Sequence, residues 1–394
     1  MQQVILVLNA GSSSIKFALY ESASLTVIRR GAIEKIGLHA EYSEGEGAQA
    51  KAPDIAEFPA DGDHDALLAW LLAHLRDEMG DASILAVGHR VVHGGRDFAG
   101  PAWVDADVRR ALEALTPLAP NHQPQNLAAI DAVAKTWPDA PQLACFDTSF
   151  HRSQPRIAQL FALPRVLSDE GVLRYGFHGL SYEYIAERLP ELIGEKAKGR
   201  VIVAHLGHGA SMCAMREGRS IATTMGFTAL DGLVMGKRCG ALAPGVILYL
   251  MGERGMSIEA VNKMLNRESG LLGVSGVSDD VRTLIASDDP HAREALELFV
   301  YRAAREIGAL VACLGGLDAL VFTAGIGEHA AFIRREICAR SQWTGLVLDE
   351  ASNEANATFI SAPSSKVTAL VVPTNEELPI ARAVVRALAE RAGA

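Results

Sequence analysis

The sequence predicts an α/β protein built from two lobes, and three observations carry this prediction. Segments typical of strands and of helices alternate along the chain, as they do in sheets covered by helices. A glycine-bearing turn between two apolar strands occurs near the start of the chain and again past its midpoint, which suggests an internal duplication with a nucleotide held between two lobes. The length of 394 residues suits two domains that each bury a core.

The individual elements follow from local patterns. Apolar runs bounded by turn residues predict strands, and apolar residues at helical spacing predict helices. The predicted strands cover residues 4–8, 15–20, 84–90, 142–146, 201–205, 319–323 and 369–372. The predicted helices cover residues 64–79, 106–115, 123–135, 181–189, 243–251, 258–265, 289–313, 330–340 and 378–392. Segment 40–59 is rich in Glu, Gly and Ala and is predicted to be a surface excursion.

The first glycine turn reads NAGSSS at residues 9–14, between the first two predicted strands, and Lys16 follows it. Successive backbone N–H groups around small residues form a concavity that binds anions. Serine hydroxyls and an ammonium group complete a site suited to phosphate. An ordinary hairpin is the alternative for this stretch taken alone.

Two further glycine turns strengthen the phosphate interpretation. The second reads GHGAS, and a gapless alignment with the first places Gly11 on Gly209 and Ser13 on Ser211. The third is a Gly-x-Gly turn at residues 325–327, which is expected to lead from a strand into a helix that starts near residue 329. Three such turns at strand ends favour a protein that binds phosphate groups.

Composition excludes several classes of protein. Hydrophobic content of 49% with 21% charged residues is that of a globular protein, and the net charge of −10 argues against a nucleic-acid surface. No apolar run reaches the ~18 residues of a membrane span, and no leader is expected. The five cysteines are an odd number without a C-x-x-C pair, which predicts reduced thiols and a cytoplasmic protein.

Ten segments, in order along the chain, resemble the acetokinase family of the actin, sugar-kinase and chaperone ATPase superfamily. They are LVLNAGSSSIKFAL, VGHRVVHGG, LAPNHQPQN, FDTSFH, RYGFHGLSY, AHLGHGAS, MGFTALDGLVMGKRCG, SGLLGVSGVSDD, FTAGIGEH and PTNEELPIAR. The resemblance covers essentially the full length. It implies two actin-like (ribonuclease H-like) lobes with the active site in the cleft between them. The N-terminal lobe is expected to span 1–148, completed by a C-terminal helix at 377–394, and the second lobe, 149–376, is expected to bind the nucleotide and to dimerise.

The resemblance also implies an activity, namely reversible transfer of the ATP γ-phosphoryl group to acetate, giving acetyl phosphate and ADP. Mg²⁺ is expected as the cofactor, Mn²⁺ as its substitute, and a homodimer without nucleic-acid or membrane partners. The alternatives are a propionate or butyrate kinase of the same family, a sugar kinase or phosphohydrolase of the superfamily, and a nucleotide-gated binding module of the chaperone kind. A sugar kinase would need a carboxylate base beside a hydroxyl acceptor, and a binding module would need a separate peptide-binding segment.

The residue chemistry favours the same reaction. A carboxylic acid is already ionised at pH 7, so its attack on phosphorus needs no general base but does need positioned cations. Arg90 and Arg238 both lie among glycines, where each guanidinium is able to bind carboxylate or phosphoryl oxygens in a bidentate manner. A surface salt bridge is the alternative for either arginine taken alone.

Family resemblance assigns the remaining site residues. The catalytic group is expected to comprise Arg90, Asp147, His178 and Arg238, with His178 stabilising the phosphoryl group in the transition state. The acyl substrate is expected to contact Arg90, Val92, Asn121, His122, Phe177 and Ala229. ATP is expected to contact Ser12, Ser14, Lys16, His205, Leu206, Gly207, His208, Gly209, Asp280, Arg282, Gly325, Ile326, Gly327 and Glu328. Mg²⁺ is expected to involve Asn9 and Glu376, with Asp147 nearby.

The chain departs from the family pattern at five positions. His208 replaces an asparagine of the second phosphate turn, and Ala241 and Ala243 replace acidic residues. In the acyl pocket, Asn121 replaces a leucine and Ala229 replaces a proline. These departures leave open the acyl preference, and the sequence does not decide the physiological direction or the nucleotide preference.

Overall fold

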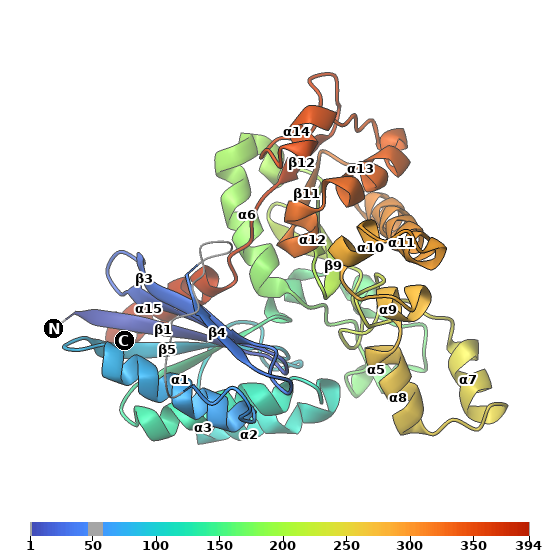
Figure 1. The fold of residues 1–394 in the computed structure, drawn as a ribbon. Helices are drawn as coiled ribbons and strands as arrows, with labels where there is room; N and C mark the ends of the chain where they lie inside the picture. Colours follow the sequence, from blue (N-terminus) through green and yellow to red (C-terminus); the bar gives the residue numbers. More distant parts are fainter. Residues whose placement is uncertain (1, 46–57, 394) are drawn as a thin grey trace. The chain divides into compact units, whose positions relative to one another are not determined.

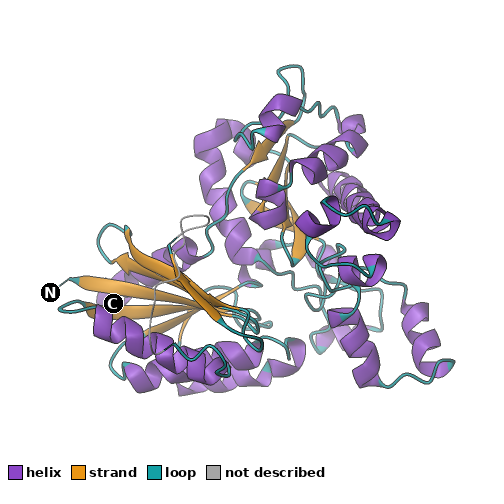
Figure 2. Cartoon of the chain, viewed as in Figure 1, coloured by secondary structure: helices purple, strands orange, loops and turns teal. Residues whose placement is uncertain are grey.

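The computed structural model describes residues 2–45 and 58–393 and separates into two units, each a mixed α/β structure (Figures 1 and 2). Unit 1 comprises Met1–Phe150 and Asn375–Ala394, and unit 2 comprises His151–Thr374. The α/β class predicted from the sequence is confirmed. Most of segment 40–59, predicted as a surface excursion, lies outside the described residues. Its described beginning is instead a strand with Tyr42 buried, because this residue packs on Phe17 and Trp70.

Unit 1 contains a seven-stranded sheet with the order β4-β3-β2-β1-β5-β7-β6. Its strands are β1 (Gln3–Ala10), β2 (Ile15–Glu21), β3 (Val27–Glu34), β4 (Glu41–Glu44), β5 (Ser83–Val91), β6 (Ala102–Trp103) and β7 (Gln142–Phe146). Strands β1, β5 and β7 are parallel, so their carboxyl ends share one edge of the sheet. The helices of unit 1 are α1 (His64–Glu78), α2 (Ala106–Ala114), α3 (Gln123–Thr136) and α15 (Glu377–Gly393).

The two faces of this sheet are covered by different helices. The side chain of Asp63 caps the start of α1, and that helix buries five leucines against one face. Helix α15 packs on the other face, where a Cβ on Gly88 would lie 2.4 Å from a methyl carbon of Ile380. Glycine at position 88 thus allows the C-terminal helix to approach β5 closely.

Unit 2 contains a five-stranded sheet with the order β10-β9-β8-β11-β12. Its strands are β8 (Val201–Leu206), β9 (Ala210–Arg216), β10 (Arg219–Thr223), β11 (Ala319–Thr323) and β12 (Thr368–Val371). Its helices are α4 (Arg156–Gln159), α5 (Arg165–Asp169), α6 (Gly179–Ile193), α7 (Pro244–Gly252), α8 (Ile258–Arg267), α9 (Gly270–Ser275), α10 (Val281–Ile285), α11 (Pro290–Leu314), α12 (Ala324–His329), α13 (Ala331–Arg340) and α14 (Glu350–Glu354).

The two sheets share a common topology. The orders β3-β2-β1-β5-β7 and β10-β9-β8-β11-β12 are equivalent, and in both the first three strands are antiparallel and the last two run parallel to the hairpin's first strand. This agrees with the predicted duplication. The predicted residue alignment is wrong, however, because the turns differ in length. Gly11 N–H donates to Ser14 O in the first turn and Gly207 N–H donates to Gly209 O in the second, so Gly11 matches Gly207.

The third glycine turn also differs from its prediction. Helix α12 begins directly after β11 and contains the whole Gly-x-Gly segment, whereas the sequence predicted a turn there and a helix only from about residue 329. Ala324 adopts a left-handed conformation with φ of 63°, which redirects the chain at once into the helix. Among the described residues, no helix is both long and apolar enough to cross a membrane, and all five cysteines have free thiols.

Candidate functional site

In unit 1, three predicted site residues meet at the carboxyl edge of the parallel strands. Asn9 is the penultimate residue of β1, Arg90 is the penultimate residue of β5, and Asp147 follows β7. The Arg90 guanidinium donates from Nη2 to Asp147 Oδ2 at 2.6 Å and from Nε to Asp147 Oδ1 at 3.1 Å. Its Nη1 donates to Asn9 Oδ1 at 3.0 Å. These three hydrogen bonds hold the Arg90 guanidinium in one orientation.

The electrostatics of this cluster keep Arg90 charged. Burial opposes the charged form, but the negative charges of Asp147 and Glu376 outweigh it and raise the pKa of Arg90 above its ordinary value. Asp147 is only 1% exposed, so its carboxylate depends on the arginine for compensation.

The first phosphate turn lies next to this cluster. Lys16 pairs with Asn9 across the β1–β2 ladder, and Ser12 and Ser14 belong to the exposed or half-exposed part of the turn. Glu376 comes just before α15, and burial together with the charge of Glu376 raises the pKa of the neighbouring Glu377. Hydroxyl, ammonium, guanidinium and carboxylate groups are thus gathered at one edge of the sheet.

The predicted acyl-binding residues of unit 1 are organised by a residue that sequence reasoning missed. Asn126, buried in the first turns of α3, accepts from Val92 N–H at 2.9 Å and donates to Ala10 O at 2.7 Å. It ties the segment after β5 to the end of β1. Asn121 and His122 are half-buried and come directly before α3. The only available signal was the position of Asn126 in the PNHQPQN segment.

In unit 2, two predicted catalytic side chains converge on the second glycine turn. A Cβ on Gly209 would lie 2.7 Å from Arg238 Nη2 and 3.3 Å from His178 Nε2. Arg238 is oriented by donation from Nη1 to Ala229 O at 2.6 Å. The backbone of Ala229 therefore positions the guanidinium, whereas Phe177 is buried and contributes its carbonyl to His151.

Two histidines form a stacked pair beside this turn. His178 occupies a left-handed conformation (φ 60°) at the start of α6, and its ring lies 4.2 Å from that of His205 at an interplanar angle of 19°. The Nε2 atom of His205 would lie 3.9 Å from a Cβ on Gly207. Both rings thus direct Nε2 toward the turn.

His208, which departs from the family pattern, lies in a polar network with Asp279 and Lys237. Its Nε2 lies 3.0 Å from Asp279 Oδ2, and Lys237 Nζ lies 3.3 Å from the same oxygen. Burial tends to raise the pKa of Asp279, but hydrogen bonds from His208 and Lys237 lower it overall. Asp279 was not predicted as a site residue, although it adjoins Asp280, which was.

A cavity of about 750 Å³ in unit 2 brings together many of the predicted nucleotide-binding residues. Its lining residues are Gly207, His208, Asp279, Asp280, Val281, Arg282, Ile285, Gly325, Ile326, His329 and Ala330. Such a mixture of glycine backbone, charged groups and apolar side chains suits a nucleotide. The other eight predicted ATP contacts lie outside this lining. Among them, Leu206 is fully buried, and Glu328 Oε1 accepts from Thr374 N–H at 3.1 Å.

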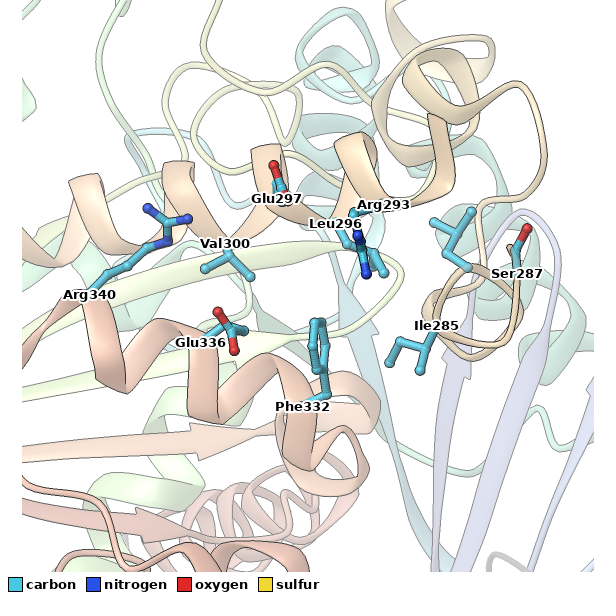
Figure 3. Close-up of a pocket in the computed structure, with 10 residues that line it drawn as sticks. Ile285, Ser287, Arg293, Leu296, Glu297, Val300, Phe332, Glu336 and Arg340 are labelled. Atoms are coloured by element: carbon cyan, nitrogen blue, oxygen red, sulfur yellow. The ribbon is translucent and has the colours of Figure 1, made fainter. Parts of the chain in front are cut away.

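A second cavity, of about 370 Å³, lies between α11 and α13 (Figure 3). Arg293, Leu296, Glu297 and Val300 of α11 line it together with Phe332, Glu336 and Arg340 of α13. Ile285 lines both cavities, but none of the predicted site residues lines the second. Of these two cavities, only the larger is lined by predicted nucleotide-binding residues.

The oxygen ligands of unit 1 fit a magnesium ion in kind. Within residues 2–45 and 58–393 no group of three or more His, Cys, Asp or Glu side chains forms a metal site. Mg²⁺ commonly takes only one or two carboxylates, keeps several waters and completes its shell with phosphates. Asn9, Asp147 and Glu376, which gather around Arg90, match that requirement.

Comparisons with known proteins agree with this arrangement. A profile of the acetokinase family matches residues 4–382. The chain is 56% identical over 393 residues to an acetate kinase of Rhodopseudomonas palustris, with 98% of each chain covered, and 47% identical to an acetate kinase of Methylocella silvestris over the full length of both. Among solved structures, Porphyromonas gingivalis acetate kinase is 37% identical with a TM-score of 0.84, covering 98% of this chain and 100% of that one. A propionate kinase from Francisella tularensis is 36% identical with a TM-score of 0.89, covering 97% and 98%. The chain belongs to the acetokinase family.

Proposed function

We propose that this protein transfers the γ-phosphoryl group of ATP reversibly to acetate, giving acetyl phosphate and ADP. The observation that carries the proposal is the convergence of Arg238 and His178 on the side-chain-free Gly209. Family membership and the names of the relatives support the same reaction.

The proposed mechanism is direct in-line attack of the acetate carboxylate on the γ-phosphorus. The larger cavity of unit 2 holds the nucleotide, and Arg238 and His178 stabilise the negative charge that develops on the phosphoryl oxygens. Arg90, held by Asp147, binds the carboxylate or the transferring group. No side chain needs to remove a proton, because the attacking carboxylate is already ionised.

Mg²⁺ is the proposed cofactor, with Mn²⁺ as a substitute, and Glu376, Asp147 and Asn9 are the residues that would hold it. When bound, the ion supplies positive charge that offsets the phosphates of ATP. Asp147→Asn and Glu376→Gln should then require much more Mg²⁺ or be inactive at any concentration. Glu113→Gln, which removes an exposed carboxylate on α2 of unit 1, is the control. An unchanged Mg²⁺ dependence in both acid variants would contradict the assignment.

Acetate is the proposed best substrate, with propionate used less well. Alanine in place of proline at position 229 provides room for a longer acyl chain. A longer chain would, however, bury the Asn121 amide without a hydrogen-bond partner, which disfavours it. Each effect is of the order of 1–3 kcal/mol. The similarity to a propionate kinase makes this choice worth testing. The test is incubation with MgATP and acetate, propionate or butyrate, followed by trapping of the acyl phosphate with hydroxylamine. We expect kcat/KM for hydroxamate formation to be highest with acetate. Phosphorylation of glycerol or a sugar without hydroxamate would favour the sugar-kinase alternative.

We further propose a cytoplasmic homodimer that associates through unit 2. Helix α7 has no buried residue although it is strongly apolar, with Val246, Leu248 and Tyr249 exposed. Ile258 at the start of the neighbouring α8 is 68% exposed. An apolar patch of this kind is typical of a subunit interface, and free thiols agree with a reducing compartment. Leu248→Glu should convert the dimer to a monomer in sedimentation experiments, whereas Lys263→Glu on α8 should not.

A further inference from the structure

A pair of hydroxyl groups supports His178 on the side of the ring away from the glycine turn. Nδ1 of His178 lies 2.8 Å from Ser211 Oγ, and Ser211 Oγ lies 2.5 Å from the hydroxyl of Tyr182. Both Ser211 and Tyr182 are completely buried. The chain Tyr182–Ser211–His178 therefore runs from the protein interior to the turn that carries Gly209.

The stacked partner ring has a similar arrangement. Nδ1 of His205 lies 2.9 Å from Ser181 Oγ, which lies 2.8 Å from Thr374 Oγ1. Each imidazole thus has a two-hydroxyl chain on Nδ1 and directs Nε2 toward the Gly207–Gly209 turn. The repetition indicates that the hydroxyls orient the rings and do not merely fill space.

The acidity of the two hydroxyls decides the direction of the hydrogen bonds at His178. A phenol is more acidic than an aliphatic alcohol and is the better donor, so Tyr182 donates to Ser211. Burial raises the pKa of Tyr182 well above its ordinary value, so the phenol keeps its proton. Ser211 then donates its own proton to Nδ1 of His178, and a neutral imidazole that accepts at Nδ1 carries its proton on Nε2.

We propose that Tyr182, acting through Ser211, is a positioning residue that fixes His178 as the neutral tautomer with its proton on Nε2, directed at the phosphoryl group. The inference rests on the proposed role of His178 in phosphoryl transfer. Nε2 lies beside the Arg238 guanidinium at Gly209, where a second positive charge would be disfavoured. A neutral N–H donor adds a hydrogen bond to the phosphoryl oxygens without that cost.

Tyr182→Phe removes the hydroxyl and keeps the buried ring. We expect a ~10-fold lower kcat, with KM for acetate and ATP within about two-fold, since one hydrogen bond in the transition state is worth ~1.4 kcal/mol. Ser211→Ala should behave in the same way and serves if the first variant folds poorly. Tyr42→Phe, which removes a buried hydroxyl bound to Glu44 in unit 1, is the matched control and should keep kcat.

A direct reading of the tautomer accompanies the kinetics. With ¹⁵N-labelled histidine, the resonances lost in His178→Gln identify this ring, and in the parent protein they should show protonated Nε2 and unprotonated Nδ1. Tyr182→Phe should give a mixture of tautomers. In the His178→Ala background, Tyr182→Phe should cause no further loss of kcat.

The outcomes separate the two layers of the proposal. Wild-type kcat in His178→Ala would refute the role of His178 itself. A loss in His178→Ala, together with an unchanged tautomer and unchanged kcat in Tyr182→Phe, would overturn the role of Tyr182 alone. The role of Tyr182 would also be overturned if the double variant, His178→Ala with Tyr182→Phe, lost kcat by the product of the two single losses. Tyr182 would then act independently of His178.

Discussion

The hairpins β1–β2 and β8–β9 hold equivalent places in two sheets of the same topology, yet their turns recruit different chemistry. The first turn has four residues, and its polar groups come from within the hairpin, from Ser12, Ser14 and Lys16. The second turn has three residues, and His208 carries its only side chain, because the other two are glycines and Ala210 follows. Its functional groups come from distant segments, as Arg238 and His178 converge on Gly209. Shared topology therefore conserves the position of the glycine turn but not the polar groups that surround it.

The partners of the two arginines also differ between the units. Arg90 is paired with the buried carboxylate of Asp147, whereas Arg238 donates to the carbonyl of Ala229. Removing Arg90 breaks an ion pair with a buried carboxylate, whereas removing Arg238 takes away a donor to a backbone carbonyl. The same residue type thus carries a structural role in unit 1 in addition to its proposed chemical one.

The largest expected effects concern these arginines. Arg90→Ala and Arg238→Ala should each lower kcat by about 10²–10³-fold, and lysine should restore little because it lacks the bidentate fork. Arg90→Ala should also lower the free energy of unfolding by ~3 kcal/mol, because it breaks the ion pair with the buried Asp147. Steady-state kinetics and urea unfolding measure both quantities. An unchanged free energy of unfolding in Arg90→Ala would contradict the structural role given to the Arg90–Asp147 ion pair.

A pair of glycine substitutions tests the turns themselves. Gly209→Ala places a methyl group 2.7 Å from Arg238 Nη2, so the guanidinium must move, and kcat should fall by roughly 10-fold or more. Gly11→Ala meets Ser14 O only at 3.4 Å, an ordinary contact, and should cost much less. A kcat for Gly209→Ala equal to that of Gly11→Ala would show that Arg238 does not need its observed position.

Buried histidines should make unit 1 the more acid-sensitive part. Burial lowers the pKa of His89 and His93 in unit 1, and of His151 in unit 2, to about 4. The unfolded chain, with a histidine pKa near ~6.5, binds more protons between these values, so stability is complete above pH ~6.5 and declines as the pH falls toward 4.

Amide hydrogen exchange between pH 7 and 5 measures this difference. Protection should fall faster in unit 1, and His89→Gln should flatten its pH dependence, whereas His39→Gln, an exposed residue, should leave it unchanged. A pH dependence that is the same in both units and insensitive to His89 would contradict the prediction.

The smallest expected effect concerns His208. His208→Asn restores the residue that the family pattern predicts and keeps the Lys237–Asp279 ion pair, so kcat should stay within a few-fold of the parent. Asp279→Ala, which removes the anchor of both His208 and Lys237, should raise KM for ATP more. An inactive His208→Asn enzyme would show that the second turn depends on the histidine.

Several features of this protein were determined by the sequence alone. Strands β7 and β11 begin and end where the apolar runs predicted, because turn residues bound a buried run at both ends. The α/β class follows from such runs alternating with helical periodicity. Strands β3, β4 and β10 and the short helices α9, α10 and α14 were not predicted, since their local patterns are weak and their pairing depends on neighbouring elements.

Only the tertiary structure decided the partnerships between distant residues. Arg90 and Asp147 are 57 positions apart, and His178 and Ser211 are 33 apart. A local pattern reports which side chains are buried and with what period, but strand order and turn length determine which of them meet. Ser211 in β9 contacts His178 at the start of α6, and no pattern within the second glycine turn contains that information.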